Sequence, residues 1–123
     1  MKRKHNFKEL QIWQKSRMLV KDIYKLTSEF PQSEIYGLTS QMRRASVSIP
    51  SNIAEGSGRK TNKEFSRFLE IAYSSALELE TQVYLSFDLE FIIESVLEEF
   101  LVKIDELQKM ISSFDTKILS ETF

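Results

Sequence analysis

Cysteine is absent from this 123-residue chain, and histidine occurs once, at position 5. The missing cysteine excludes disulfide bonds, thiolate metal ligands and cysteine nucleophiles. A lone histidine supports neither a Ser–His–Asp triad nor paired Glu-x-x-His metal motifs. No stretch approaches the ~18 consecutive apolar residues of a transmembrane helix, and no apolar segment follows the charged N-terminus as in a secretory signal. We therefore expect a cytoplasmic protein that is not an enzyme and uses no metal or cofactor.

Glycine and proline are also scarce, with three and two residues respectively. Because both are common turn formers, the chain is expected to consist of a few long elements joined by short turns. Hydrophobic residues make up 41% and charged residues 28%, which is typical of a folded globular protein. The length suits one small core, which burial against further subunits would help to stabilise. We predict a single domain over residues 1–123.

Apolar residues recur at alternating spacings of three and four in four segments, the pattern of helices that each bury one side. The predicted helices span about residues 7–29, 33–56, 62–87 and 95–119. Ser33, Thr61 and Ser95 are the expected N-terminal caps of the last three. The inward stripes are Ile12, Ser16, Leu19, Ile23, Leu26 and Phe30; Ile35, Leu38, Met42, Ala45, Ile49 and Asn52; Phe65, Leu69, Ala72, Ala76, Leu79 and Val83; and Ile93, Leu97, Phe100, Ile104, Leu107, Ile111, Phe114 and Ile118.

Helices of this length joined by short turns predict an all-α protein, folded as an antiparallel up-down-up-down four-helix bundle. The second helix departs from the simple pattern. Pro50 lies inside it and is expected to kink it or loosen one turn. Its outward side carries Tyr36, Val47 and Ala54, so this helix is apolar on two sides. Such a helix is usually covered twice, here by its own bundle and by a neighbouring subunit, which predicts a homo-oligomer.

Positive charge is concentrated in the first half of the chain, although the net charge is −1. Residues 1–67 carry fourteen Lys/Arg and six Asp/Glu, whereas residues 68–123 carry three and twelve. The halves either meet different partners or neutralise each other within the bundle or between subunits. In an up-down bundle the turn between the second and third helices lies near the chain start, so the basic leader at residues 1–4 is expected beside that turn.

Rows of cations bind phosphates and release counterions, which gives salt-dependent affinity for nucleic acid. The alternative is an ordinary solvated helix face. The candidate nucleic-acid contacts are Lys8, Lys15, Arg17, Lys21 and Lys25 on the first helix, Arg43 on the second, and Arg59, Lys60, Lys63 and Arg67 around the start of the third.

Glu80 falls on the apolar side of the third helix, where an unpaired carboxylate is costly. It is expected to pair with a cation from the neighbouring helix, where Arg43 and Arg44 are the candidates. We assign the structural ion pair to Arg44 and Glu80. A catalytic carboxylate is the alternative, but no second acid or histidine is expected beside it.

The segment 37–56 reads GLTSQMRRASVSIPSNIAEG. It closely resembles the signature of a bacterial four-helix-bundle family, the 23S ribosomal RNA intervening-sequence proteins, also called S23. The flanking segments fit the same family: Phe7 to Trp13 with Gln14-Lys15, Phe30-Pro31 with Glu34, and Phe65 through Glu80. The resemblance covers about residues 7–115.

This resemblance implies a left-handed up-down bundle that assembles as a ring-like homopentamer. Some relatives are encoded within insertions in 23S ribosomal RNA genes. A related branch, the accessory variability protein of diversity-generating retroelements, is a basic pentamer that binds nucleic acid and the reverse transcriptase. This chain departs from that branch in its pI of about 5.9. The expected function is a non-enzymatic homo-oligomer that binds RNA or another nucleic acid through basic surfaces. The alternative is a protein–protein interaction scaffold that binds no nucleic acid.

Overall fold

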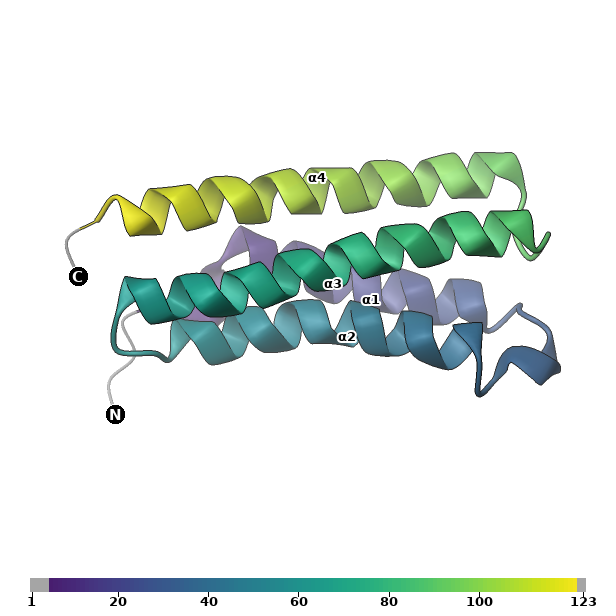
Figure 1. The fold of residues 1–123 in the computed structure, drawn as a ribbon, viewed down its shortest axis with the longest axis horizontal. Coiled ribbons are helices and arrows are strands. Elements are labelled where there is room, and N and C mark those ends of the chain that lie inside the picture. Colours follow the sequence, from purple (N-terminus) through teal and green to yellow (C-terminus); the bar gives the residue numbers. More distant parts are fainter. Residues whose placement is uncertain (1–4, 122–123) are drawn as a thin grey trace.

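A computed structural model describes residues 5–121, and within them the secondary structure is entirely helical. The four long helices are α1 Gln11–Thr27, α2 Leu38–Ser57, α3 Asn62–Asp88 and α4 Glu94–Leu119. Two short 3-10 helices, η1 Phe7–Glu9 and η2 Gln32–Glu34, precede α1 and α2. Consecutive long helices lie side by side and reverse direction at each connection (Figure 1). The predicted all-α four-helix bundle is confirmed, and its left-handed twist stays a prediction.

The start of the described chain lies at the same end of the bundle as the α2–α3 turn and the end of α4 (Figure 1). The His5 ring packs on Phe65 and Phe114, with ring centroids 5.1 and 6.2 Å apart. Its Nε2 lies 3.4 Å from Oδ1 of the buried Asn62. These contacts place the chain start where the α2–α3 turn was expected to meet it. The leader at residues 1–4 lies outside the described residues.

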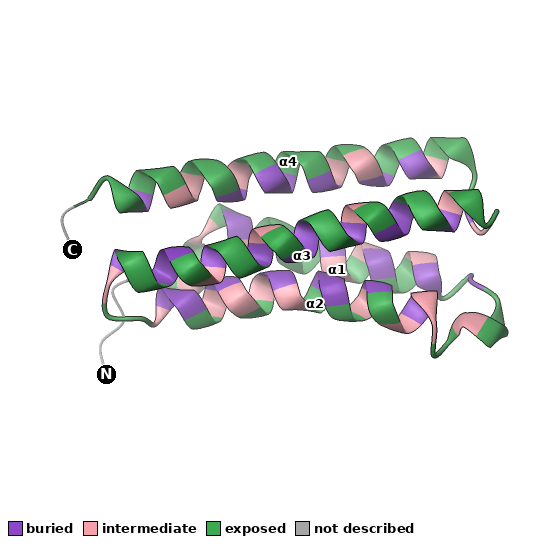
Figure 2. Cartoon of the chain, in the orientation of Figure 1, coloured by how far each residue is buried: buried purple, intermediate pink, exposed green. Residues whose placement is uncertain are grey.

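The buried residues face the centre of the bundle, and the outward faces are mostly exposed (Figure 2). All six residues of the predicted α3 stripe are buried. Two members of the other stripes are exposed instead, Ile35 and Ile93. Both lie just before a helix begins, so the helical spacing does not extend to them. Ile53, which the stripe omitted, is fully buried in the core.

Two predicted helix starts were wrong, and the predicted Ser95 cap of the last helix is absent. Leu10 is extended and separates η1 from α1, so α1 begins at Gln11 rather than at residue 7. Ser33 lies in η2 and does not cap α2; Oε1 of Glu34 accepts a hydrogen bond from the Leu38 amide, 3.1 Å away, where the helix begins. Helix α4 begins at Glu94 without a side-chain cap, so Ser95 lies inside it.

The Thr61 cap is present, because its Oγ1 accepts a hydrogen bond from the Glu64 amide, 3.1 Å away. Replacing Thr61→Ala should lower the free energy of unfolding by about 1 kcal/mol, since an amide at the start of α3 would lose its acceptor. Urea denaturation at fixed protein concentration measures this change. Thr81→Ala is the matched control: Thr81 is exposed inside α3, and its hydroxyl bonds only the Leu77 carbonyl. Equal losses in the two variants would contradict the capping role.

Candidate nucleic-acid interface

Four cations gather at the end of the bundle that carries the α2–α3 turn. Arg59 and Lys60 lie in the turn, and Lys63 and Arg67 lie on the first turns of α3. We call this group the basic end; its members are Arg59, Lys60, Lys63 and Arg67. All four are exposed. The positive end of the α3 helix dipole lies at the same place and adds to their field.

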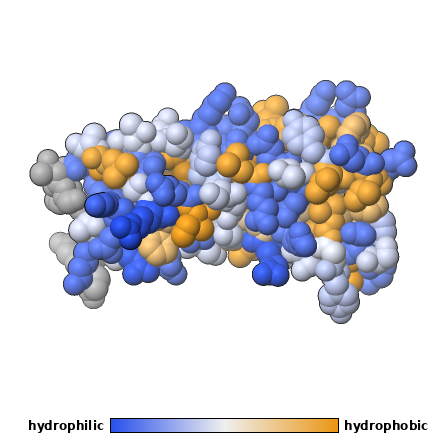
Figure 3. Space-filling model, in the orientation of Figure 1, coloured by the Kyte–Doolittle hydropathy of each residue, from blue (hydrophilic) through white to orange (hydrophobic). Residues whose placement is uncertain are grey.

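On the face seen in Figure 3, strongly hydrophilic side chains gather at the end of the bundle that holds the start of α3. The side chains of Lys60, Lys63 and Arg67 make no hydrogen bond or ion pair with any residue from 5 to 121. Glu55 and Glu64 are the acidic residues of this segment, and Oε2 of Glu121 lies 3.5 Å from Nδ2 of Asn62 at the same end. Of these carboxylates, that of Glu55 pairs with a member of the basic end, Arg59, at 3.5 Å. The basic end therefore presents cations whose charge is not neutralised by contact within the described chain.

Arg59 is held differently from the other three. Its guanidinium carbon lies 4.5 Å from the centroid of the Phe68 ring, so a cation–π contact supports one face of the group. Phe68 in turn packs close to Gly56, where a Cβ would lie only 2.6 Å from the Cβ of Phe68. The close approach of α2 and α3 at Gly56 thus positions the ring beneath the arginine.

The cations of α1 are more engaged than the sequence indicated. Nζ of Lys15 pairs with Glu106 of α4 at 2.7 Å. Also between α1 and α4, Nζ of Lys103 lies 3.2 Å from Asp22. The same Nζ lies 3.0 Å from Glu99 on its own helix. Burial alone would lower the pKa of Lys103, but its hydrogen bonds to Glu99 and Asp22 and their charges raise the pKa above its usual value. Part of the charge asymmetry is therefore neutralised between α1 and α4 of one chain.

The remaining α1 candidates divide into two groups. Arg17 lies over the Trp13 ring, 5.4 Å from its centroid, and remains exposed. Lys21 and Lys25 are exposed and have no ion pair within the described part of the chain. Lys8 is not on α1 at all, because it lies in η1 before the extended Leu10. The predicted surface of five cations is therefore not continuous. Three of them, Arg17, Lys21 and Lys25, are exposed on α1 without an ion pair to any described residue.

Arg43 and Arg44 have roles other than those predicted. Nε of Arg43 donates to Oγ1 of Thr27 at 2.9 Å, and its guanidinium lies 4.6 Å from the Tyr24 ring centroid. Arg43 therefore joins α2 to α1 and is poorly placed to meet nucleic acid. Arg44 is exposed beside a polar cleft between α2 and α3. The sequence prediction assigned Arg44 to an ion pair and therefore did not predict its exposure.

The predicted Arg44–Glu80 ion pair was wrong. Nε2 of Gln108 on α4 donates to Oε1 of Glu80 at 2.8 Å. Arg44 lies on the outer side of the α2–α3 seam with Glu78, whereas Glu80 lies on the side of α3 that faces α4. The two side chains are on different faces of α3, which explains why they do not meet. A neutral amide satisfies this half-buried carboxylate in place of a cation.

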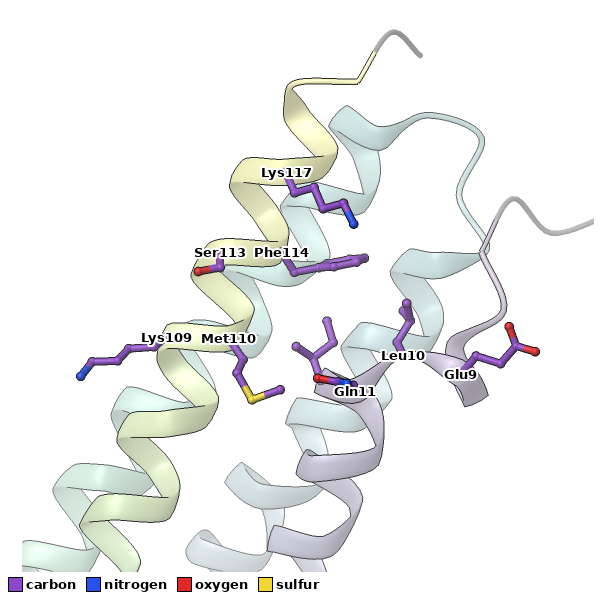
Figure 4. Close-up of a pocket in the computed structure, with 9 residues that line it drawn as sticks. Glu9, Leu10, Gln11, Lys109, Met110, Ser113, Phe114 and Lys117 are labelled. Atoms are coloured by element: carbon purple, nitrogen blue, oxygen red, sulfur yellow. The ribbon is translucent and has the colours of Figure 1, made fainter.

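An apolar hollow lies between the start of α1 and the second half of α4 (Figure 4). Its volume is about 510 Å³. Leu10, Ile12, Met110 and Phe114 form its apolar walls, and Lys117 extends across its upper part (Figure 4). It is an open groove without convergent acids or bases, and it offers no arrangement for acid–base chemistry.

The opposite end of the bundle has the reverse charge. The α1–α2 and α3–α4 connections meet there (Figure 1), and segments 28–38 and 88–94 contain no lysine or arginine. We call it the acidic end; its carboxylates are Glu29, Glu34, Asp88, Glu90 and Glu94. Exposed apolar side chains, including Tyr36, Leu89 and Ile93, lie among them. The charge of the chain is therefore polarised along its long axis.

Residues 5–121 contain no group of three or more His, Asp or Glu side chains placed to hold a metal ion. None of the helices in this part of the chain is long and apolar enough to cross a membrane.

The sequence model of the 23S rRNA-intervening sequence protein family matches residues 8–113. The family predicted from segment 37–56 is thereby confirmed. A 1.70 Å crystal structure of a protein of unknown function from the S23 ribosomal protein family of Bacteroides thetaiotaomicron VPI-5482 has the same fold, with a TM-score of 0.79. The two sequences are 24% identical, and the alignment covers 85% of this chain and 95% of the other. No curated protein matches this sequence.

Proposed function

The chain belongs to the 23S rRNA-intervening sequence protein family, and we propose that it is a non-enzymatic, homo-oligomeric protein that binds RNA through the basic end. The observation that carries this proposal is the group of three exposed cations, Lys60, Lys63 and Arg67, that have no ion pair within the described chain. Cations of this kind neutralise phosphates without first breaking an existing pair. The net charge of −1 does not oppose such binding, because the five carboxylates of the acidic end lie at the far end of the bundle.

The cations of α1 are a weaker contact surface. To bind a phosphate, Lys15 would have to break its ion pair with Glu106. The carboxylates of the adjacent α4 would also repel a phosphate there. Arg17, Lys21 and Lys25 remain as a possible extension of the surface, to be reached by a longer RNA. Arg43 is not part of the proposed contact surface, because its guanidinium contacts Thr27 and Tyr24 of α1.

Assembly with further copies, in a pentameric ring as the family resemblance implies, is supported by the outward side of α2. Ser40, Val47, Ser51 and Ala54 are small and uncharged there, and Val47 is exposed. Small side chains allow another backbone to approach closely, and a ring would bring several basic ends together. Each added phosphate contact would steepen the salt dependence of binding.

Fluorescence anisotropy with labelled single-stranded RNA at low salt, combined with light scattering in the same buffer, tests the proposal. We expect saturable binding and a mass several times that of the 14.4 kDa chain. A protein that remains monomeric or ignores RNA at low salt would contradict the corresponding part of the proposal.

A protein-interaction scaffold is the second candidate, and the acidic end is the observation that favours it. Apolar side chains are exposed there, with Tyr36 at 94% and Ile93 at 68%, in the two segments that carry the carboxylates of the acidic end. This combination suits a basic protein segment with apolar anchors. An intact oligomer without RNA affinity would favour this function over RNA binding.

A further inference from the structure

The stack of Arg59 on Phe68 distinguishes one member of the basic end from a simple point charge. The ring covers one face of the planar guanidinium at 4.5 Å, while 43% of the Arg59 side chain remains exposed. NH2 of Arg59 also lies 3.5 Å from Oε2 of Glu55, which holds the edge of the group. With one face and one edge engaged, the opposite face is the part that a planar ligand can cover.

The surroundings keep this stack in place. Gly58 ends α2, and the Arg59 amide donates to the Gly56 carbonyl at 3.0 Å, which fixes the backbone that carries the arginine. Phe68 is half-buried in α3 against Gly56. The guanidinium is therefore held by a ring, a carboxylate and a fixed backbone, so little conformational entropy is lost when a ligand stacks on it.

Resting on the RNA binding proposed above, we propose that the basic end recognises unpaired nucleotides, with one base stacked on the exposed face of Arg59 and neighbouring phosphates on Lys60, Lys63 and Arg67. Guanidinium planes and aromatic rings are the platforms on which proteins stack single-stranded bases. In an A-form duplex the faces of the bases are covered by their neighbours and are not offered to such a platform. The basic end should therefore prefer single-stranded RNA to duplex RNA.

Arg59→Lys tests the stack, because it keeps the positive charge and removes the planar group. Arg44→Lys is the matched control, since it makes the same exchange at an exposed arginine that lies outside the basic end and has no ring contact among the described residues. Three probes are compared by anisotropy: a short single-stranded RNA, the same strand made abasic, and a duplex of the same length. Circular dichroism establishes that both variants are folded.

We expect Arg59→Lys to weaken binding of the single strand by about tenfold, in the range of one lost base stack. Its affinity for the abasic strand should be unchanged, and Arg44→Lys should bind all three probes like the unaltered protein. Equal losses in the two variants, or equal affinity of the unaltered protein for single strand and duplex, would overturn the stacking proposal. Failure of the unaltered protein to bind any of the three probes would instead overturn the RNA binding on which it rests.

Phe68→Leu gives an independent check, because it removes the supporting ring and keeps an apolar side chain against Gly56. We expect it to reproduce the base-dependent loss of Arg59→Lys, with the salt dependence of binding retained. A folded Phe68→Leu protein with undiminished preference for the single strand would contradict a role for the ring.

Discussion

Reversing the charges of Lys60, Lys63 and Arg67 together should weaken RNA binding by about a hundredfold or more at low salt. These side chains make no ion pair within residues 5–121, so their loss removes phosphate contacts without releasing a carboxylate partner. The slope of log association constant against log salt should become shallower by about 2, since each single-strand phosphate contact contributes about 0.7. Anisotropy titrations of the triple glutamate variant across a salt series measure both quantities.

The matched control is the triple variant Arg17→Glu, Lys21→Glu and Lys25→Glu. It changes the net charge by the same amount but lies on α1, which the proposal gives only a secondary role. We expect it to retain most of the affinity of the unaltered protein. If the α1 variant loses binding and the basic-end variant keeps it, the interface has been assigned to the wrong surface. Equal losses would indicate that only the net charge matters.

Replacing Gly56→Ala should lower the free energy of unfolding by about 2 kcal/mol. The added methyl would lie 2.6 Å from Cβ of Phe68 and 2.7 Å from Cδ1 of Phe65, so α2 and α3 would have to separate. Overpacking of this kind costs about 1–3 kcal/mol, and a contact this close is expected near the upper end of that range. The better helix propensity of alanine offsets up to about 1 kcal/mol of this cost. Urea denaturation at fixed protein concentration measures the change, because the stability of an oligomer depends on concentration.

Gly58→Ala provides the comparison for this change. Its backbone has φ of −89°, which alanine adopts freely, and the nearest atom to an added Cβ is the Glu55 carbonyl oxygen at 3.6 Å. This variant should be as stable as the unaltered protein or more stable by less than about 1 kcal/mol. If the two alanine variants unfold at the same urea concentration, the close approach at Gly56 does not control the packing of α2 on α3.

The periodicity of apolar residues was sufficient to predict the helices and most of the core. Each helix buries one side, and the resulting spacing of apolar residues does not depend on which helix lies beside it. It failed at Ile35 and Ile93, where apolar residues precede a helix and the spacing has no structural meaning. The starts of α1 and α2 could not be predicted either. They depend on the extended backbone of Leu10 and on capping by Glu34, which lies four positions before the first residue of α2.

Prediction of the surface was less successful, since the partner of a charged side chain depends on which faces of two helices meet. Glu80 accepts from Gln108 of α4, a contact that requires the register of α3 against α4. For the same reason, the sequence did not separate Arg43, which packs on Tyr24, from the exposed Arg44. The four residues of the basic end lie together as their closeness along the chain predicted, and their contact with nucleic acid stays a prediction. The stack on Phe68 could not be predicted, because it depends on the approach of α2 to α3.

The salt dependence of single-stranded RNA binding by the unaltered protein tests the central proposal most directly. Association constants measured by anisotropy from low to moderate salt should fall along a straight line in a double-logarithmic plot. Three phosphate contacts at one basic end predict a slope of about −2, and a ring of several basic ends predicts a steeper one. A slope near zero, or no binding at the lowest salt, would contradict recognition of RNA by the basic end and direct attention to protein partners of the acidic end.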